Sequence, residues 1–360
     1  MRFASLVLSF LACTAALAQP PAAIVDAAFV DNYAKQHDYS GAVVIAHDGK
    51  VSVDGRYGEA NRAFKVPNGP HTKYWIASIT KAFTAVLVLQ LHEEGKLKLD
   101  GTIADYLPDY TGEGARKITV RQLLDHTSGL PNFDNVKSAE DAIKNGLPAY
   151  QKPWTPAELV ARFCSGALVN APGTTFDYNN GDYLILGRII EQVAGKPYET
   201  VLRERILAPL KLAGTGLIKQ HEILHDLANT YFFRDDLGTL VNDLPVYPEN
   251  WYAAGAMYAT PADVLAFSDA LFGGRLIKPA TLALMTKPGL EDYGYGVWSF
   301  DMKMGGKSVH VVKRPGRIMG AQAMLFRVIE PNLTIVLLAN TASVDLDEFA
   351  AAIARKLLAE

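Results

Sequence analysis

Cysteine is almost absent from this sequence: among 360 residues only Cys13 and Cys164 occur, and Cys13 lies in the apolar run at the N-terminus. If that run is removed, the single remaining cysteine cannot form an internal disulfide. A basic excess is also lacking, because 35 Lys and Arg face 38 Asp and Glu and the net charge is −3. Proteins whose main task is nucleic-acid binding need such an excess to neutralise phosphates. No run of 18 apolar residues follows the N-terminus, so we expect neither a nucleic-acid partner nor a membrane span.

Two motifs that would indicate other enzyme classes are missing as well. No serine stands in the G-x-S-x-G elbow of the α/β-hydrolases, and no G-x-G-x-x-G follows a strand-like run, as nucleotide-binding folds require. We therefore expect no cofactor. Cys164 has no motif around it, and we interpret it as a small buried apolar residue rather than a nucleophile.

The first 18 residues have the pattern of a secretory signal peptide. Arg2 is followed by an apolar run over residues 3–15, and the Ala-Leu-Ala at 16–18 is a small-x-small cleavage site. Cleavage after Ala18 predicts a periplasmic or secreted protein. The alternative is a lipoprotein that is cleaved before Cys13 and anchored through it.

Hydrophobic periodicity changes twice along the rest of the chain. Helical spacing over residues 22–36 is followed by two β-rich runs around the Asp-Gly of 47–50, which predicts a hairpin. A very apolar helix is expected over 79–94, and helical patterns continue to about residue 285. Strands return after residue 290, before a final amphipathic helix that begins at Leu346.

This order of elements predicts an α/β (α+β) fold with one antiparallel sheet built from both ends of the chain and flanked by the two terminal helices. Residues 19–75 plus 286–360 would form the sheet domain. Residues 76–285 would form an inserted, mainly helical domain, and the active site would lie between the two.

A candidate nucleophile opens the apolar helix. Ser78 and Lys81 are three residues apart, so they share a helix face and the lysine can reach the hydroxyl. A lysine beside so apolar a helix is partly desolvated, which favours its neutral, basic form. The motif alone is weak, because an S-x-x-K is expected about 0.7 times by chance in this composition. The alternative interpretation is that Ser78 only caps the helix and that the side chain of Lys81 extends to the surface.

A second candidate pair is Tyr178 and Asn180, in an irregular Pro- and Gly-rich loop before a helix. A tyrosine near a lysine can act as a phenolate base or return a proton to the leaving group. Asn180 can hydrogen-bond both the lysine and the substrate. A half-buried tyrosine and a turn asparagine would look the same in the sequence.

The chain resembles the serine hydrolases of the class C β-lactamase type, a family that includes D-alanyl-D-alanine carboxypeptidases, D-aminopeptidases and esterases. The resemblance rests on SITK, ITVRQLLDHTSGLPNF, PGTTFDYNNGDYLILGRIIE and AAGAMYATPADVLAFSDAL, which occur in the family's order between about residues 40 and 340. It implies that Ser78 is the acylated nucleophile, that Lys81 and Tyr178 share the acid–base work, and that Asn180 supports them. His126 falls where the resemblance implies structural residues, and we interpret it as a packing or hydrogen-bonding residue.

The third element of the family departs from its usual pattern here. Arg314-Pro315-Gly316 stands where the family has Lys or His, a small residue or Thr, and Gly. Arginine keeps the positive charge but cannot act as a base, and Pro315 has neither hydroxyl nor N–H. The backbone N–H of Arg317 is a candidate second oxyanion donor beside that of Ser78, and Arg314 or Arg317 is a candidate carboxylate ligand. Because strand residues alternate between faces, at most one of these arginines is expected to reach the substrate.

A rival motif is His221-Glu222-Ile223-Leu224-His225, which matches the H-E-x-x-H zinc-protease signature. It needs a third ligand, and the G-x-x-H extension does not follow it. Glu249 is the next acidic candidate, but it lies in a Pro-rich loop. We therefore expect no metal site and hold a zinc metalloprotease as a minor alternative.

These patterns together predict a serine hydrolase that acts through an acyl-enzyme on an ester, amide or lactam carbonyl of a small-molecule or peptide substrate. Because Pro315 offers no hydroxyl to a substrate carboxylate, hydrolysis of short esters is expected to exceed hydrolysis of β-lactams. The alternative from another class is a non-catalytic binder that has kept the fold.

Overall fold

The computed structural model describes residues 27–134, 136 and 138–358. The predicted signal peptide, its cleavage site and Cys13 lie outside the described residues. No helix among the described residues is long and apolar enough to cross a membrane.

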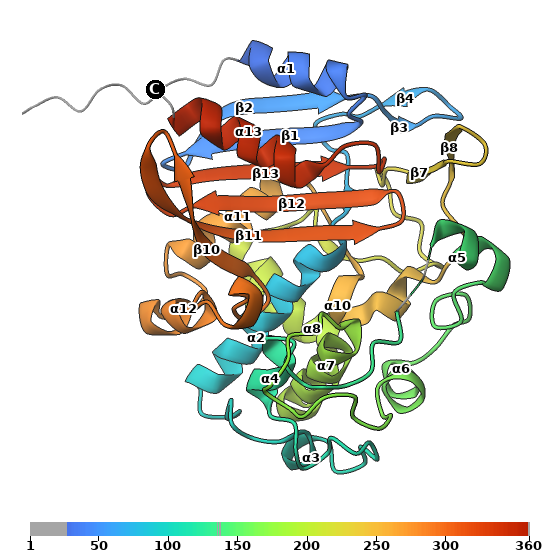
Figure 1. Cartoon of the computed structure of the whole chain (residues 1–360), viewed down its shortest axis with the longest axis vertical. Helices are drawn as coiled ribbons and strands as arrows, with labels where there is room; N and C mark the ends of the chain where they lie inside the picture. The colour runs from blue at the N-terminus through green and yellow to red at the C-terminus, as the bar shows by residue number, and fades with distance from the viewer. Residues whose placement is uncertain (1–26, 135, 137, 359–360) are drawn as a thin grey trace, which may run out of the picture.

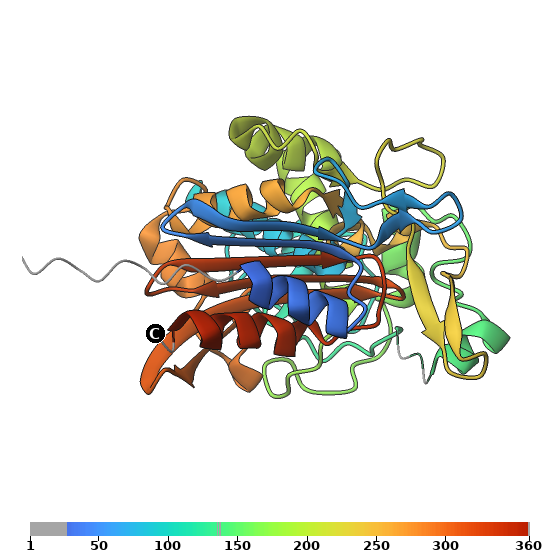
Figure 2. The same ribbon diagram turned by 90° about the horizontal axis from the view of Figure 1, so that it is seen from above.

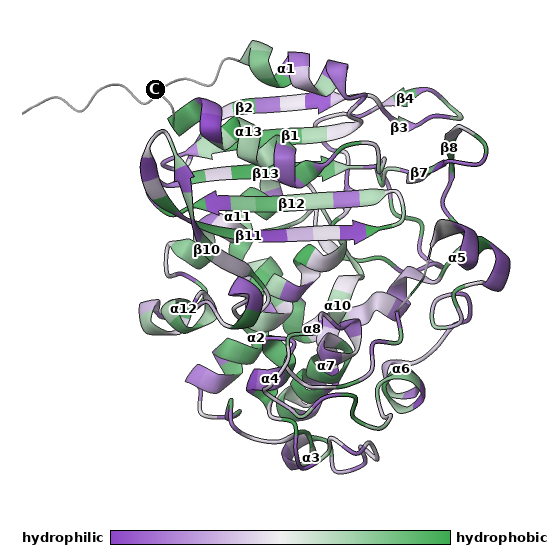
Figure 3. Ribbon diagram, viewed as in Figure 1, coloured by the Kyte–Doolittle hydropathy of each residue, from purple (hydrophilic) through white to green (hydrophobic). Residues whose placement is uncertain are grey.

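A six-stranded antiparallel sheet is the frame of the molecule, and its strands come from both ends of the chain (Figure 1). The order is β10-β11-β12-β13-β1-β2, so that β1 and β13 lie side by side although almost 300 residues separate them. Every residue of β12 and β13 is buried, which agrees with their mainly apolar sequences (Figure 3). The polar exceptions are Gln322, Arg327 and Thr334. The strands are β1 (Gly41–His47), β2 (Lys50–Tyr57), β10 (Trp298–Met304), β11 (Lys307–Ile318), β12 (Ala321–Val328) and β13 (Leu333–Ala339).

The predicted hairpin between β1 and β2 is confirmed. His47 pairs with Lys50, so the turn contains only Asp48 and Gly49, whose φ angles are 48° and 73°. Positive φ at both central residues is the requirement of the two-residue turn that matches the twist of the strands, and Asp-Gly meets it.

Helices cover both faces of the sheet. The terminal helices α1 (Ala27–Gln36) and α13 (Leu346–Leu358) lie on one face, as predicted (Figure 2). There the ring of Tyr33 stacks on that of Phe349 at 4.2 Å. On the opposite face α11 (Pro261–Phe272) packs against β1 and β13.

Helix α2 (Thr80–Glu93) runs from the edge of the sheet into the helical part of the molecule, and nearly all of its side chains are buried. It packs against α7, α8, α10 and α12, as its apolar sequence predicts. The short 3-10 helix η1 (Ala77–Ile79) leads into α2 and lies against β11 and β12. This contact joins the start of the central helix to the sheet.

The rest of the middle region consists of short helices with several short strands among them. β5, β9 and β6 form a small sheet, and β7 and β8 form a hairpin, which the sequence reading did not resolve. The remaining helices are α3 (Ile103–Tyr106), α4 (Val120–Leu124), α5 (Ala139–Asn145), α6 (Pro156–Phe163), α7 (Asn180–Ala194), α8 (Tyr198–Leu202), α9 (Ala208–Leu210), α10 (Tyr252–Gly255) and α12 (Pro279–Met285), with one π-turn, η2 (Arg203–Leu207), and the 3-10 helices η3 (Pro248–Trp251) and η4 (Leu290–Asp292). The short strands are β3 (Glu59–Asn61), β4 (Val66–Pro67), β5 (Tyr74–Trp75), β6 (Gly216–Leu217), β7 (Tyr231–Arg234), β8 (Thr239–Asn242) and β9 (Met257–Ala259).

Candidate active site

Ser78 lies in η1, directly before the buried helix α2. The residue before it, Ala77, has φ of +45°, a conformation that a residue with a Cβ rarely adopts and that is concentrated at functional sites. Lys81 is one turn further along and fully buried, and its Nζ is 3.2 Å from Ser78 Oγ. The spacing of the two residues therefore brings the amine to the hydroxyl.

Tyr178 reaches the same hydroxyl from the loop before α7. Its phenol donates a hydrogen bond of 2.8 Å to Ser78 Oγ, so two ionisable groups contact the serine oxygen. The loop is held in place because Asn132 donates a hydrogen bond to the Tyr178 carbonyl at 2.9 Å.

Asn180 begins α7 and links the lysine to a carboxylate. Lys81 Nζ donates to Asn180 Oδ1 at 2.5 Å, and Asn180 Nδ2 donates to Asp134 Oδ2 at 2.5 Å. Tyr150 also hydrogen-bonds Asp134. Ala254 O accepts a further hydrogen bond from Lys81 at 2.9 Å. Nζ is thus surrounded by oxygen atoms that fix its position.

Arg314 lies beneath these groups rather than at the surface of a cleft. Its side chain is 1% exposed and donates to Ser78 O at 2.6 Å, to Tyr178 OH at 2.5 Å and to Tyr293 OH at 3.1 Å. No carboxylate among the described residues forms an ion pair with it. The guanidinium instead lies within 6 Å of the ring centres of Tyr178, Tyr293 and Trp298. Three N–H groups of the guanidinium, one each on Nε, Nη1 and Nη2, are thus engaged within the protein.

The electrostatics of the site bring its two acid–base candidates close together. Burial lowers the pKa of Lys81 to about 8. Burial alone would raise the pKa of Tyr178, but the positive charges of Arg314 and Lys81 outweigh it and lower that pKa to about 8. Both groups can therefore exchange protons near neutral pH, as acid–base catalysis requires.

Gly316 allows the edge of β11 to approach the nucleophile. A Cβ on this residue would lie 2.6 Å from Ile76 O and 2.8 Å from Ser78 N, distances that no side chain tolerates. The pairing of β11 with β10 ends at Lys313. Beyond this residue, the edge of β11 on the side of β10 has no neighbouring strand among the described residues.

The register of β11 indicates where the N–H of Arg317 points. Pro315 pairs with Met324 and Arg317 with Gln322 without a register shift. Pro315 has no N–H, so it occupies a position whose backbone faces away from β12. Residues two apart on a strand face the same side. The N–H of Arg317 is therefore directed to the open edge, where Ser78 lies.

Two clefts meet at this edge. One, of about 550 Å³, is lined by Ser78, Tyr178 and Trp298 together with β11, β12 and the segment before α13. The other, of about 1330 Å³, is lined by Asn180, Asp134 and the β7–β8 hairpin. Arg317 lines both clefts, and it is exposed on the strand face opposite to that of Arg314.

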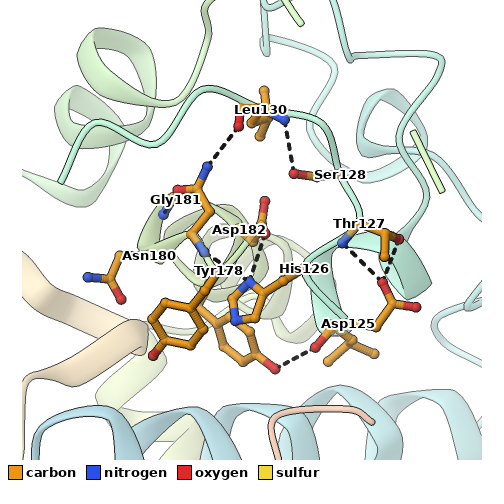
Figure 4. Close-up of polar contacts among 12 residues, drawn as sticks. Asp125, His126, Thr127, Ser128, Leu130, Tyr178, Asn180, Gly181 and Asp182 are labelled. Carbon is orange, nitrogen blue, oxygen red and sulfur yellow. Dashed lines mark hydrogen bonds and ion pairs between the residues drawn. The ribbon is translucent and has the colours of Figure 1, made fainter. Parts of the chain in front are cut away.

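His126 and Asp182 form a fully buried pair behind Tyr178 (Figure 4). Nδ1 of His126 lies 2.9 Å from a carboxyl oxygen of Asp182, and the imidazole ring is 4.5 Å from the ring of Tyr178. Burial lowers the pKa of His126 well below its usual range, and burial raises the pKa of Asp182 well above its usual range. Burial therefore disfavours the charged form of both side chains.

Several residues of the site could not be identified in the sequence. Asp134 and Tyr150 have no motif of their own, and only the family segment around Asp134 gave a signal. Asp134 directly follows HTSGLPNF, a stretch that carries part of the family resemblance and in which only His126 was interpreted, as a structural residue.

The zinc-protease reading is not supported by the structure. Residues 221–225 form a turn and an irregular segment rather than a helix, so His221 and His225 do not share a helix face. No group of three metal-ligating side chains is found in the part of the chain that the structure describes. Cys164 is buried, as predicted, and burial raises the pKa of its thiol well above the usual range.

Known proteins share the family and the fold of this chain. The family profile described as Beta-lactamase matches residues 25–360. The teichoic acid D-alanine hydrolase of Staphylococcus aureus is 26% identical over 275 residues, which are 75% of this chain and 65% of that protein. The chain spans about 65% of the length of the curated relatives it matches.

Solved structures give the same result for the fold. A penicillin-binding protein from Bacillus halodurans is 26% identical, with a TM-score of 0.78 over 90% of this chain and 98% of that one. A D-stereospecific amidohydrolase from Streptomyces sp. is 29% identical, with a TM-score of 0.77 over 91% of this chain and 98% of that one. The D-amino acid amidase of Ochrobactrum anthropi SV3, complexed with D-phenylalanine, is 26% identical, with a TM-score of 0.75 over 92% and 96%.

Proposed function

The chain belongs to the Beta-lactamase family and is a serine hydrolase; from this premise we propose that it cleaves ester or amide carbonyls through an acyl-enzyme on Ser78. The observation that carries the proposal is the pair of contacts at Ser78 Oγ, to Lys81 Nζ at 3.2 Å and to Tyr178 OH at 2.8 Å. A serine hydroxyl is a weak nucleophile until a base removes its proton, and two candidate bases contact it directly.

The proposed reaction has two steps. Lys81 or Tyr178 takes the proton of Ser78 as Oγ attacks the carbonyl carbon, and the N–H groups of Ser78 and Arg317 hold the oxyanion. The proton then passes through Tyr178 to the leaving oxygen or nitrogen as its bond to the acyl carbon breaks. Water, deprotonated by the same base, attacks the acyl-enzyme and releases the acid and free Ser78.

We propose that esters are hydrolysed faster than β-lactams. Pro315 supplies no hydroxyl where a β-lactam or peptide carboxylate would bind, and the guanidinium of Arg314 is already engaged with Ser78 and Tyr178. An alkoxide also departs more easily than an amine. The names of the relatives, which mention D-alanine and D-amino acids, bring D-amino-acyl esters and amides into the range to be tested.

We further propose that the protein acts outside the cytoplasm, after cleavage behind Ala18. A lipoprotein anchored through Cys13 is the alternative. In this proposal the sheet domain consists of residues 19–75 plus 286–360, the helical domain of residues 76–285, and the substrate enters between them.

Covalent labelling tests the function directly. Wild-type protein is incubated with a fluorophosphonate and, separately, with a penicillin, and the modified peptide is located by mass spectrometry. We expect label on Ser78, and none in Ser78→Ala. Turnover of p-nitrophenyl butyrate should exceed that of nitrocefin and should disappear in Ser78→Ala. Ligand binding without labelling or turnover would identify the protein as the non-catalytic binder instead.

A further inference from the structure

We propose that Asp243 is a positioning residue for the oxyanion site. Its carboxylate holds the turn between β11 and β12 and thereby directs the backbone N–H of Arg317 toward the acyl oxygen of the substrate. The inference rests on the proposed function, because it concerns the oxyanion that forms when Ser78 attacks. It connects the β7–β8 hairpin, a wall of the larger cleft, to the chemistry at the edge of β11.

The turn between β11 and β12 is held in an unusual conformation. It contains only Met319 and Gly320, because Ile318 pairs with Ala321. Met319 rather than the glycine has the positive φ, which is 48°. A residue with a Cβ rarely adopts this φ, so contacts around the turn must keep it there. Arg317 comes two residues before Met319, so the direction of its N–H depends on how the turn is held.

The backbone of Tyr231 lies against one side of this turn. A Cβ on Gly320 would be 2.3 Å from Tyr231 O, so only glycine fits at this contact. Tyr231 is itself fixed on both sides: its N–H donates to Asn340 O at 2.9 Å, and its hydroxyl accepts the N–H of Arg62 at 2.9 Å. The turn therefore cannot move toward β7.

Asp243 holds the turn from the base of the same hairpin, which lies beside the end of the sheet where β11 turns into β12 (Figure 1). It directly follows Asn242, the partner of Tyr231 in the β7–β8 pairing. Both of its carboxyl oxygens accept the N–H of Gly320, at 3.0 and 3.2 Å. Its own N–H donates to Thr230 O at 3.3 Å, which ties it to the opposite strand. Without this carboxylate, nothing in this set of contacts pulls the turn toward β7.

The carboxyl group is ionised under mildly alkaline conditions. Burial raises the pKa of Asp243 to about 6, so at pH 8 the group is a carboxylate. A hydrogen bond from a backbone N–H to a carboxylate is about twice as strong as one between neutral groups. The turn is therefore held by a strong contact at the pH of the assay below.

An oxyanion donor is sensitive to small displacements, because it must lie about 3 Å from the charge that develops. At Gly316 the strand β11 already approaches Ser78 N so closely that a Cβ would be 2.8 Å away. A shift of the nearby turn changes the direction of the Arg317 N–H. Lys81 and Tyr178 lie on other elements and keep their contacts with Ser78. Loss of the Asp243 carboxylate should therefore weaken oxyanion stabilisation and spare both substrate binding and proton transfer.

Hydrolysis of p-nitrophenyl butyrate at pH 8 tests this role in Asp243→Ala. Rates are expressed per active site, counted by complete labelling of Ser78 with a fluorophosphonate, so that unfolded protein does not contribute. We expect kcat to decrease about tenfold or more, with KM within about twofold of wild type. KM stays because acylation and deacylation both form an oxyanion and slow together.

Two further substitutions at the same position separate the acceptor from the fold. Asp243→Asn keeps an oxygen that accepts the N–H of Gly320, and it should restore kcat to within about threefold of wild type. The hydroxyl of Asp243→Ser is too short to reach the turn, so this variant should lose activity as alanine does. It replaces the alanine variant if that protein does not fold.

Asp263→Ala is the matched control. Asp263 Oδ2 accepts the N–H of Gly214 at 2.8 Å and the hydroxyl of Thr215 at 2.8 Å, so it holds a glycine N–H as Asp243 does. None of these three residues lines either of the two clefts. We expect Asp263→Ala to lower the Tm to an extent similar to that of Asp243→Ala and to leave kcat unchanged.

A double-mutant cycle with Gly316→Ala tells whether Asp243 acts through β11. In the Gly316→Ala background the N–H of Arg317 is already displaced, so adding Asp243→Ala should lower kcat by less than about threefold. The positioning role is overturned by wild-type kcat in folded Asp243→Ala or Asp243→Ser, by an equal loss in Asp263→Ala, or by the same loss in both backgrounds. Each of these results leaves the serine hydrolase intact. Ester hydrolysis that survives in Ser78→Ala would instead overturn the proposed nucleophile.

Discussion

Arg314 donates a hydrogen bond of 2.5 Å to the phenol oxygen of Tyr178, across 136 positions of sequence. The guanidinium is buried without a carboxylate among the described residues to neutralise it, so its charge acts on the tyrosine and on the carbonyl of Ser78. An arginine is always protonated, and it cannot exchange protons with its neighbours as a lysine in this place could. We propose that Arg314 is a positioning residue that stabilises the phenolate form of Tyr178.

Replacing Arg314 by methionine should move the pH dependence of the reaction. The charge of Arg314 contributes to the lowered pKa of Tyr178, about 8, and to the lowered pKa of Lys81. Without that charge both pKa values increase, and the ascending limb of the kcat/KM profile should shift to higher pH. Activity at pH 7 should decrease by about tenfold or more. Arg314→Lys should restore part of it. If the ascending limb of the kcat/KM profile stays in place in the methionine variant, Arg314 contributes through packing alone and not through its charge.

The closeness of β11 to η1 predicts a strong effect at Gly316. In Gly316→Ala the new methyl group would meet Ile76 O and Ser78 N, and β11 must move away from the nucleophile. If the Arg317 N–H stabilises the oxyanion, the loss in kcat should be on the order of a hundredfold. Gly69→Ala is the matched control, because its added Cβ has no neighbour closer than 3.9 Å. Comparable activity in the two variants would exclude the oxyanion role.

The sheet and its terminal helices could be anticipated from periodicity, and the contact of Ser78 with Lys81 from their spacing. The meeting of these two residues with Tyr178 and Asn180 was implied only by the family resemblance. The burial of Arg314 could not be anticipated. Alternation along a strand predicts which face of the sheet a side chain takes, but it does not predict what covers that face. Asp134 and Asp243 were missed for a related reason. Their importance comes from neighbours brought together by tertiary structure, across 46 residues for Asp134 and Asn180. The H-E-x-x-H pattern shows the reverse limit, because residues 221–225 match the five-residue signature without forming the helix that it requires.

The buried pair of His126 and Asp182 predicts a particular dependence of stability on pH. The pKa of Asp182 is raised in the folded protein, so unfolding releases a proton and stability decreases as pH rises above the usual carboxyl range. Asp182→Asn removes this titration and keeps the shape. We expect its Tm, relative to wild type, to be higher at pH 8 than at pH 4.5, by about 2 °C for each kcal/mol. Thermal melts over this pH range measure the difference, and a pH-independent offset would contradict it.

The last prediction concerns Asp134, which determines the orientation of the Asn180 amide. A carboxylate only accepts hydrogen bonds, so it holds Nδ2 toward itself and leaves Oδ1 to accept from Lys81. In the Asp134→Asn variant the new amide can both donate and accept, so the Asn180 amide is free to turn over. Lys81 then loses an acceptor of fixed orientation. We expect kcat/KM to decrease about tenfold, on the scale of one hydrogen bond to a charged group.

The same substitution removes a negative charge that raises the pKa of Lys81. That pKa should therefore decrease further, and the ascending limb of the kcat/KM profile should shift to lower pH, opposite to the shift expected for Arg314→Met. Asp109→Asn, at an exposed position, is the control for charge. If the ascending limb of the pH profile shifts in Arg314→Met but not in Asp134→Asn, the group that titrates is Tyr178, because Asp134 acts mainly on the lysine. Movement in both variants, in opposite directions, would support Lys81 as the base that titrates.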